Sequence, residues 1–287
     1  MLVIGASGRV GRLLMPAWSR AGAGVIVQRR GGAVLGAGLP EIRWSPLDAP
    51  HALPGLLAGL PPVGAMLVLA GVTPSSPGAG AELMALNTAL AEACMRAAEQ
   101  AGIGRVLLAS SSAVYGAGRA EPWREDEPAQ PATPYAQAKL AMERAAEPWR
   151  KRGLSICALR IGNVAGADAL LLNAGRKEPL VIDRFVGGSG PLRSYIGPQT
   201  MARVLSALAD PATDLLPVLN LAAPAPVSMD ALARAAGLDW TWRPAPPQAI
   251  ARLTLNCSAL AARVAFDDSD SSAAGIVAQW NACRSPA

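Results

Sequence analysis

The feature that most constrains this chain is an alternation, over its first 165 residues, of short apolar runs with longer segments of helical periodicity. The short runs are candidate strands, at residues 1–5, 24–28, 41–44, 64–71, 105–110 and 155–162. Residues 9–21 and 81–100 show helical spacing. In the second of these segments the predicted apolar stripe consists of Leu83, Leu86, Leu90, Cys94 and Ala97. Because strands separated by helices pair in parallel, the pattern predicts an α/β fold with a doubly wound parallel sheet.

The chain changes character at about residue 165, where Gly, Pro and Ala increase and candidate strands become isolated. The stretch GGSGPLRSYIGPQT, residues 187–200, is predicted to be a long functional loop. Further predicted elements are a helix at 200–209, a short strand at 217–222 and a helix near 228–236. We therefore predict one domain over residues 1–165 and a smaller region over residues 166–287 that is partly interleaved with it.

Composition narrows the classes of partner. Of the 287 residues 51% are hydrophobic, but no apolar run approaches the ~20 residues of a membrane span. The first residues, MLVIGASG, lack a basic stretch followed by an apolar signal core. The net charge of +5 comes from scattered basic residues whose longest clusters are pairs. We therefore expect a cytoplasmic protein that binds neither membrane nor nucleic acid.

Histidine and cysteine are too sparse for most metal or nucleophile chemistry. His51 is the only histidine, which argues against a histidine-based triad or a multi-histidine metal site. The four cysteines are far apart and form no C-x-x-C pair: Cys94, Cys157, Cys257 and Cys283. They fit reduced, mostly buried thiols better than disulfides or zinc ligands. We expect no metal, so the chemistry must come from other groups.

A glycine-rich loop follows the first predicted strand. The sequence VIGASGRVGRLL places Gly5, Gly8 and Gly11 between that strand and the first predicted helix. Glycines at such a junction permit a tight turn and a close approach of the backbone to a diphosphate, which the free N–H groups of the helix N-terminus stabilise. The spacing is one residue longer than G-x-G-x-x-G. The loop predicts a bound dinucleotide.

The end of the second predicted strand indicates which dinucleotide is bound. An acidic residue there hydrogen-bonds a ribose 2′-hydroxyl, whereas an arginine accommodates a 2′-phosphate. This chain has Gln28, Arg29 and Arg30 and no carboxylate. NADP is therefore slightly favoured over NAD, with Arg29 as the phosphate ligand, although both arginines would also serve as solvated side chains at a strand end. Asp48, after the third strand, is a candidate partner of the adenine amino group.

A second group of polar residues follows the fifth predicted strand. The run ASSSAVYGAG has three serines at the carboxyl end of a strand, where doubly wound folds hold their ligands. The next predicted helix begins at Thr133-Pro134 and ends at Pro148. It has Tyr135 and Lys139 on one face because they are four residues apart. A phenol pKa near ~10 is too high for a base at neutral pH, and a nearby ammonium lowers it. These groups are the parts of a proton-transfer site for a carbonyl or alcohol.

Several segments, taken in order, match a known family. They are GASGRVG, LAG at 69–71, Asn87, SSSAVYG at 110–116, and residues 124–144, 159–166, 191–210 and 218–237. With them the chain resembles an extended short-chain dehydrogenase/reductase of the NAD-dependent epimerase/dehydratase group. The resemblance implies a Rossmann fold in which residues 1–165 bind the dinucleotide and residues 166–287 bind substrate. It implies hydride transfer to or from a carbonyl or secondary alcohol, as in a sugar or sugar nucleotide, and a homodimer.

The resemblance also implies roles for individual residues. Ser111 corresponds to the catalytic hydroxyl, Tyr135 to the general acid/base, and Lys139 to the residue that contacts the nicotinamide ribose and tunes the phenol. The diphosphate loop corresponds to Gly5, Ser7, Gly8, Arg9, Val10 and Gly11, and the walls around ribose and nicotinamide to Ala70, Gly71 and Ser110. Positions that approach substrate correspond to Ser112, Asn163 and Arg193. Asn163 is equally interpreted as a loop-stabilising residue, and Arg193 as a surface arginine.

The reaction stays open between several alternatives. Relatives that dehydrate sugar nucleotides have acidic residues just after the catalytic hydroxyl, and Ser112 and Ala113 occupy those positions here, which disfavours a 4,6-dehydratase. An epimerase and an NADP-dependent reductase of a non-sugar carbonyl compound remain. A non-catalytic dinucleotide-binding sensor is a third alternative, although a sensor has no need of an activated phenol. Trp240 and Trp242 are interpreted either as base-stacking residues or as a half-buried strand.

Overall fold

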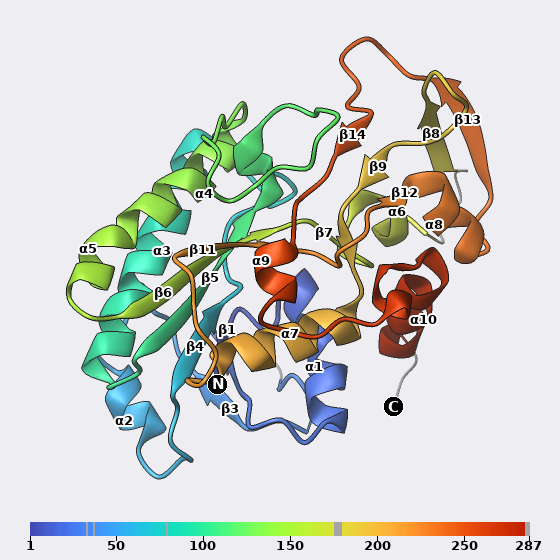
Figure 1. The fold of residues 1–287 in the computed structure, drawn as a ribbon. Helices are drawn as coiled ribbons and strands as arrows, with labels where there is room; N and C mark the ends of the chain where they lie inside the picture. Colours follow the sequence, from blue (N-terminus) through green and yellow to red (C-terminus); the bar gives the residue numbers. More distant parts are fainter. Residues whose placement is uncertain (33, 37, 79, 175–179, 285–287) are drawn as a thin grey trace.

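The structure is a computed structural model that describes residues 1–32, 34–36, 38–78, 80–174 and 180–284. Its centre is a parallel sheet with seven strands among these residues, in the order β11-β6-β5-β4-β1-β2-β3 (Figure 1). The strands are β1 (Leu2–Ile4), β2 (Ile26–Arg29), β3 (Glu41–Arg43), β4 (Ala65–Val68), β5 (Arg105–Ser111), β6 (Ser155–Ile161) and β11 (Val218–Leu221). The six strands predicted for the first 165 residues are confirmed to within a few residues.

Helices cover both faces of this sheet. Those that supply most of the cover are α1 (Arg9–Arg20), α3 (Ala81–Gln100), α4 (Pro134–Ala145) and α7 (Pro198–Ala209). Side chains of a strand alternate between the faces, so Val3 of β1 packs in one core with Leu14 of α1 and Leu205 of α7. Its neighbour Leu2 packs in the other core with Cys94 of α3 and Met142 of α4. The two cores confirm the predicted doubly wound arrangement.

The buried face of α3 differs from the predicted stripe. Leu86 is 41% exposed and Leu90 is only partly buried, although Cys94 is buried as predicted. The buried face consists of Met84, Asn87, Ala91, Cys94, Met95, Ala97 and Ala98. It includes an amide and several small residues, which a count of large apolar side chains does not register.

Helix α4 begins where predicted but ends earlier. Thr133 caps it through its side-chain oxygen, and Pro134 occupies its first turn. It ends at Ala145, and Pro148 lies in the first turn of a separate helix, α5 (Glu147–Lys151). A proline is tolerated there because the N–H groups of a first turn have no intrahelical acceptor. The prediction that Pro148 closes the helix is therefore wrong.

Beyond residue 165 the described chain forms most of three small sheets. They are β7 (Asn163–Val164) with β10 (Tyr195–Ile196), β9 (Leu192–Arg193) with β12 (Val227–Ser228) and β14 (Arg252–Leu253), and β8 (Leu180–Arg184) with β13 (Trp240–Pro244). The remaining helices are α2 (Leu53–Leu57), α6 (Ala169–Leu172), α8 (Met229–Ala235), α9 (Ser258–Ala261) and α10 (Ala273–Arg284). The predicted loop at 187–200 holds β9, β10 and the start of α7, so that prediction is wrong in part. Strands of two residues are too short to show a period.

The second part of the chain returns to the central sheet. The predicted strand at 217–222 is present as β11, which extends the sheet beyond β6 in parallel register, with Leu219 beside Leu159. The predicted helix at 200–209 is present as α7, which packs on α1, where the Trp18 indole donates to the Ala202 carbonyl at 3.1 Å. Residues beyond 165 therefore complete the sheet and one of its two cores.

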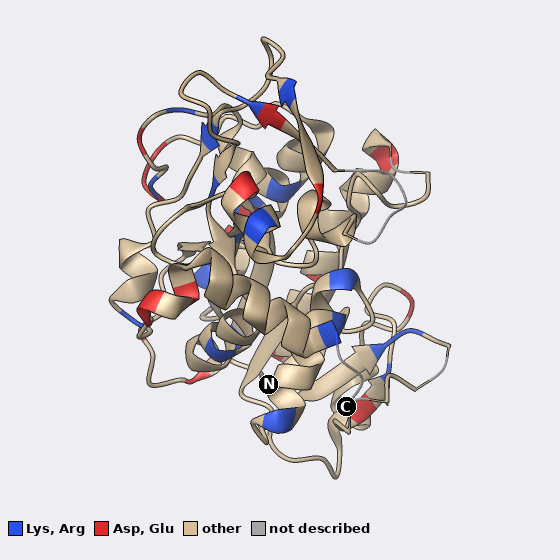
Figure 2. Ribbon diagram, turned by 90° about the vertical axis from the view of Figure 1, so that its right-hand side faces the viewer, with Lys and Arg blue, Asp and Glu red and all other residues tan. Residues whose placement is uncertain are grey.

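Charged residues and cysteines are spread over the described part of the chain. Figure 2 shows Lys and Arg interspersed with Asp and Glu along the ribbon. Cys94, Cys157 and Cys257 are free and buried, and Cys283 is free and partly buried, as predicted. In the described part of the chain, no helix combines the length and the apolar character that a membrane crossing needs.

Candidate functional site

The glycine loop joins β1 to α1 and makes contacts that a side chain would block. Gly5 has φ +83°, and a Cβ on it would lie 2.6 Å from the Ala70 backbone, just after β4. A Cβ on Gly11 would overlap the Ala6 backbone. Helix α1 begins after Gly8 with no capping side chain. The N–H groups of its first turn are therefore available to an anion, as the predicted diphosphate contact requires.

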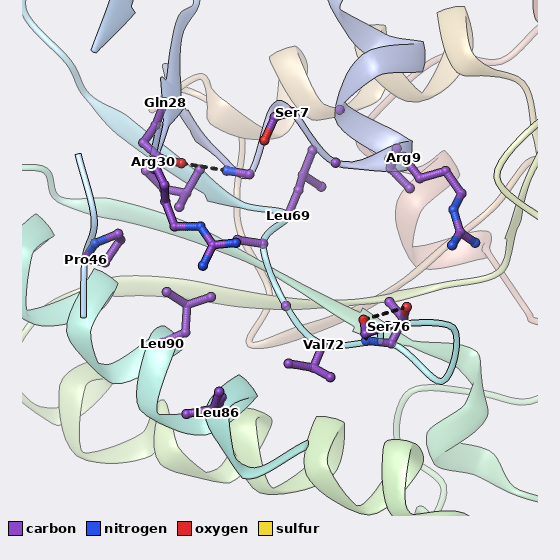
Figure 3. A pocket seen from close by; sticks show the side chains of 18 of the residues that line it. Ser7, Arg9, Gln28, Arg30, Pro46, Leu69, Val72, Ser76, Leu86 and Leu90 are labelled. Carbon is purple, nitrogen blue, oxygen red and sulfur yellow. Dashed lines mark hydrogen bonds between the residues drawn. The ribbon is translucent and has the colours of Figure 1, made fainter. Parts of the chain in front are cut away.

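A cleft of about 520 Å³ lies at the carboxyl ends of β1 and β4 (Figure 3). The strand order reverses here, because β1 and β4 are adjacent while β2 and β3 lie on one side and β5 and β6 on the other. Most of the predicted cofactor residues line it, namely Gly5, Ser7, Gly8, Arg9, Val10, Gly11, Asp48, Ala70 and Gly71. Leu69, Leu86 and Leu90 supply apolar walls. Leu86 and Leu90, which do not belong to the buried face of α3, thus face the cleft.

The residues after the middle of β2 lie in three different environments. Gln28 is buried, accepts a hydrogen bond from the Gly5 N–H at 3.0 Å, and so holds the glycine loop to β2. Arg29 pairs with Glu41 of β3 at 3.0 Å and is not among the described residues that line the cleft. Arg30 lines the cleft, and Figure 3 shows its side chain directed into it. Consecutive residues of a strand point in opposite directions, so Arg30 replaces Arg29 as the candidate phosphate ligand.

Two polar side chains of the cleft are bonded to its rim. Arg9 donates to the Ser75 hydroxyl at 2.7 Å and so links the start of α1 to the segment after β4. Asp48 accepts a hydrogen bond from the Ser45 hydroxyl at 2.7 Å. Both bonds hold side chains at the positions where the sequence predicts cofactor contacts.

Ser111, Tyr135 and Lys139 come together beside this cleft. Ser111 ends β5, where its Oγ accepts a hydrogen bond from the Ala113 N–H at 3.2 Å. Tyr135 and Lys139 are one turn apart on α4, with the Lys139 Nζ 5.9 Å from the centre of the Tyr135 ring. The link to the cleft is Gly71, because a Cβ there would lie 3.4 Å from the Lys139 Nζ. The three predicted catalytic residues thus adjoin the predicted cofactor walls.

Burial dominates the ionisation of these groups. It raises the pKa of the Tyr135 phenol, and a hydrogen bond with Ser111 acts in the opposite direction. It lowers the pKa of Lys139 to about 8, and the Glu143 carboxylate acts against this. Lys139 is 5% exposed, and its Nζ donates to the Ala109 carbonyl at 2.7 Å. At neutral pH, in the protein alone, the phenol is protonated and the lysine is mostly charged.

Ser110, predicted as a cofactor wall, is bonded to a buried ion pair. Its hydroxyl donates to the Glu143 carboxylate. Arg160 of β6 donates to the same carboxylate, with 2.9 Å between Nη2 and Oε2. Sequence reasoning missed both charged residues. One signal was available, since Glu143 follows Lys139 at the spacing that separates Lys139 from Tyr135, but a glutamate on a helix is usually solvated.

The three predicted substrate residues lie in separate environments. Ser112 is buried in the turn of 3₁₀ helix, η1 (Ser112–Tyr115), that follows β5. Asn163 begins β7 and is partly buried. The Arg193 guanidinium donates to the Ile250 carbonyl at 2.7 Å, and burial lowers its pKa. Arg193 is therefore held by the backbone that precedes β14 and is not a free surface arginine.

The cleft fits a dinucleotide. Its diphosphate end offers an uncapped helix N-terminus and the Arg9 side chain, and its other end has apolar walls beside Arg30 and Asp48. Among the described residues, no group of three or more His, Cys, Asp or Glu side chains is placed to hold a metal ion. The donors suit an anionic ligand, and the apolar walls suit a flat ring attached to it.

Comparisons with known proteins agree with this geometry. The sequence model of the NAD dependent epimerase/dehydratase family matches residues 1–204. A UDP-glucose 4-epimerase of Azospirillum brasilense is 42% identical over 83 residues, 29% of this chain and 24% of that enzyme. The match thus spans about a quarter of the curated relative. The structure of MoeE5 in complex with UDP-glucose and NAD is 26% identical, with a TM-score of 0.76 over 99% of this chain and 98% of that one. A Brucella ovis UDP-glucose 4-epimerase complexed with NAD shares the fold, with 21% identity and a TM-score of 0.79 over 96% of this chain and 95% of that one.

Proposed function

Since the chain belongs to the NAD-dependent epimerase/dehydratase family, we propose that it is an enzyme that moves hydride between a nicotinamide dinucleotide and a carbon of a sugar nucleotide. The observation that carries this proposal is the convergence of Ser111, Tyr135 and Lys139 next to the cleft. Ser111 is hydrogen-bonded to Tyr135, and the Lys139 Nζ lies beside Gly71 of the cleft wall. The curated relative is a UDP-glucose 4-epimerase, and the MoeE5 structure holds UDP-glucose and NAD. These relatives support epimerisation of a hexose attached to UDP as the reaction.

In this proposal the side chains of the site divide the proton chemistry among them. The bound nicotinamide supplies the hydride acceptor and donor. Ser111 holds the substrate oxygen by a hydrogen bond, and Tyr135 takes the proton of the alcohol as it is oxidised and returns it on reduction. Burial raises the pKa of Tyr135, so its phenolate needs a nearby positive charge. The Lys139 ammonium supplies that charge.

Replacing Tyr135 by phenylalanine tests this function. The variant lacks the group that transfers the proton, so we expect turnover to fall by about 100-fold or more. The interconversion of UDP-glucose and UDP-galactose is measured by chromatography, and the absorbance of the dinucleotide is recorded in parallel. Product formed with no net change of absorbance identifies an epimerase, and a net change identifies a dehydrogenase or reductase.

Dinucleotide binding is the control, because Tyr135→Phe removes one oxygen and leaves the glycine loop intact. Equal affinity of wild type and variant for NAD, with turnover lost, supports the assignment. Unchanged turnover in the variant contradicts the role of Tyr135. A wild type that binds dinucleotide and converts no UDP-sugar, UDP-glucose and UDP-glucuronic acid included, contradicts the proposed function.

We also propose that the cleft accepts NADP as well as NAD, with Arg30 as the ligand of the 2′-phosphate. No carboxylate stands directly after β2 to repel that phosphate, and the Arg30 side chain lies in the cleft while Arg29 is paired with Glu41. The MoeE5 and Brucella ovis structures hold NAD, so both dinucleotides need to be measured.

Arg30→Ala should weaken NADP binding by about tenfold or more, since a hydrogen-bonded charge is lost, and leave NAD binding nearly unchanged. Arg29→Ala is the matched control and should leave both affinities nearly unchanged. Calorimetry of the three proteins with each dinucleotide measures this. A loss of NADP affinity in Arg29→Ala rather than Arg30→Ala would contradict the assignment.

A further inference from the structure

Glu143 is a buried carboxylate on the helix that holds the proton-transfer residues. Tyr135, Lys139 and Glu143 follow one another at four-residue intervals on α4 and so share one face. Glu143 is 6% exposed, and so is its partner, Arg160. Burying a carboxylate costs free energy unless it is paired and hydrogen-bonded. The proton chemistry proposed above does not use this group.

The partners of Glu143 come from both neighbouring strands. Ser110 of β5 and Arg160 of β6 are opposite each other in the register of the sheet, and both donate to the Glu143 carboxylate. Arg160 makes three hydrogen bonds to it, two from Nε at 3.2 Å and one from Nη2 at 2.9 Å. The third guanidinium nitrogen donates to the Tyr115 hydroxyl at 3.1 Å, and that hydroxyl donates to Asn220 of β11. Glu143 is thus held in one place by the sheet.

The surroundings of Lys139 leave Glu143 as its source of negative charge. On α4 the ionisable neighbours are the Tyr135 phenol and the Glu143 carboxylate, and the charged residue facing from β6 is Arg160, beyond the carboxylate. Strand β5 presents the Ala109 carbonyl, which accepts from the Lys139 Nζ. Helix α3 presents Asn87, a neutral amide that, like the Lys139 Nζ, lies at Gly71. Burial disfavours the ammonium, and Glu143 favours it.

We propose that Glu143, fixed by Ser110 and Arg160, is a positioning residue that keeps Lys139 in its ammonium form at the wall of the cofactor cleft. The role rests on the proposed function only in its consequence for turnover, because the charge of Lys139 can be measured without a substrate. Removal of the carboxylate leaves Lys139 and Arg160 as two buried cations. Loss of a proton from Lys139 then relieves both the burial cost and the like-charge repulsion.

The test measures the titration of Lys139 directly. The chain has three lysines, Lys139, Lys151 and Lys177, so labelling with ¹³Cε-lysine gives few NMR signals, and Lys139→Met identifies the one of interest. In wild type the Lys139 signal should titrate at about 8. In Glu143→Gln its pKa should fall by about one pH unit or more. Glu147→Gln is the matched control, because Glu147 is a largely exposed glutamate one turn further on, and its Lys139 titration should match wild type.

Glu143→Asp keeps the charge and should keep the Lys139 pKa closer to wild type than the glutamine variant does. Equal pKa values in wild type and Glu143→Gln overturn the proposal. If Glu143→Gln does not fold, the wild type still decides, because a wild-type Lys139 that titrates well below pH 7, and so is uncharged at neutral pH, also overturns the proposal. These outcomes do not depend on which substrate the enzyme uses.

Turnover supplies a second readout. Activity that needs the Lys139 ammonium is lost as pH rises through its pKa, so the alkaline limit of the pH–rate profile should move down in Glu143→Gln by as much as the NMR titration does. A variant slower at every pH, with an unmoved alkaline limit, indicates a merely structural role and overturns the proposal. A different outcome separates the two proposals. If wild type has no turnover but the Lys139 pKa still falls in Glu143→Gln, the role of Glu143 stands and the proposed function is refuted.

Discussion

The Lys139 ammonium lies in surroundings that disfavour its charge. It is buried on the inner face of α4, and its folded pKa of about 8 is well below the ordinary 10.5. The same position puts its Nζ beside Gly71 and the Tyr135 ring, where a positive charge is useful to a phenolate. The protein therefore gives up stability to hold this charge beside the cleft.

Replacing Lys139 by methionine should change how stability depends on pH. Between the folded pKa of about 8 and the unfolded 10.5, the unfolded chain binds more protons than the folded protein, so this group makes stability rise with pH. The variant lacks that contribution. Relative to it, wild type should gain about 2 kcal/mol in free energy of unfolding between about pH 7 and about pH 9.5.

Urea denaturation of the two cofactor-free proteins at both pH values measures this difference. The variant also loses the hydrogen bond to the Ala109 carbonyl, which lowers its free energy of unfolding at both pH values. The change in that free energy between the two pH values is therefore compared, because the lost bond cancels in it. A difference in stability that stays constant between the two pH values would show that Lys139 is not desolvated in the folded protein.

At the scale of elements, α4 and its two strands assemble the site. The four-residue spacing on α4 predicts that Tyr135 and Lys139 share a face, and the Lys139 Nζ lies 5.9 Å from the centre of the Tyr135 ring. The pairing of Ser110 with Arg160 depends on β5 lying beside β6, which their positions in the chain suggest but their residue types do not specify. The spacing of Glu143 from Lys139 places it on the same face, but its burial could not be predicted, because burial follows from what packs around it.

Two other segments also differ from their prediction because of residues distant in the chain. The buried face of α3 differs from the predicted stripe because it includes Asn87. This amide is hydrogen-bonded to the backbone of Val72, which lies in the segment after β4. The predicted loop at 187–200 contains β9 and β10, whose partners are up to about 60 residues away, as in the pairing of Arg193 with Leu253. Local patterns predict elements with a period and miss elements defined by their partners.

At the scale of the whole molecule, the two parts of the chain share one sheet and one core. β11 pairs with β6, and α7 supplies Met201, Val204, Leu205 and Leu208 to the core on the α1 face, all of them fully buried. The division at residue 165 separates the predicted roles of the two parts but cuts through this core. Their folding should therefore be coupled.

A fragment of residues 1–165 tests that coupling. It lacks β11 and α7, so Leu159 and the buried side of α1 would be exposed, and we expect no cooperative thermal transition and no NAD binding. Circular dichroism melting and calorimetry of the fragment beside the full chain measure both properties. A fragment that melts cooperatively and binds NAD as tightly as the full chain would show that the first part folds alone.

By itself the sequence determined the class of fold, the glycine loop and the shared helical face of Tyr135 and Lys139, because these depend on local periodicity and on residues close together in the chain. The choice of Ser111 rested on the resemblance to a known family. Only the tertiary structure decided that Arg30 rather than Arg29 faces the cleft and that Arg193 is held by a backbone carbonyl. It also decided that Glu143 is buried beside Arg160. The direction and burial of a side chain depend on what the rest of the chain places around it, which no local pattern contains.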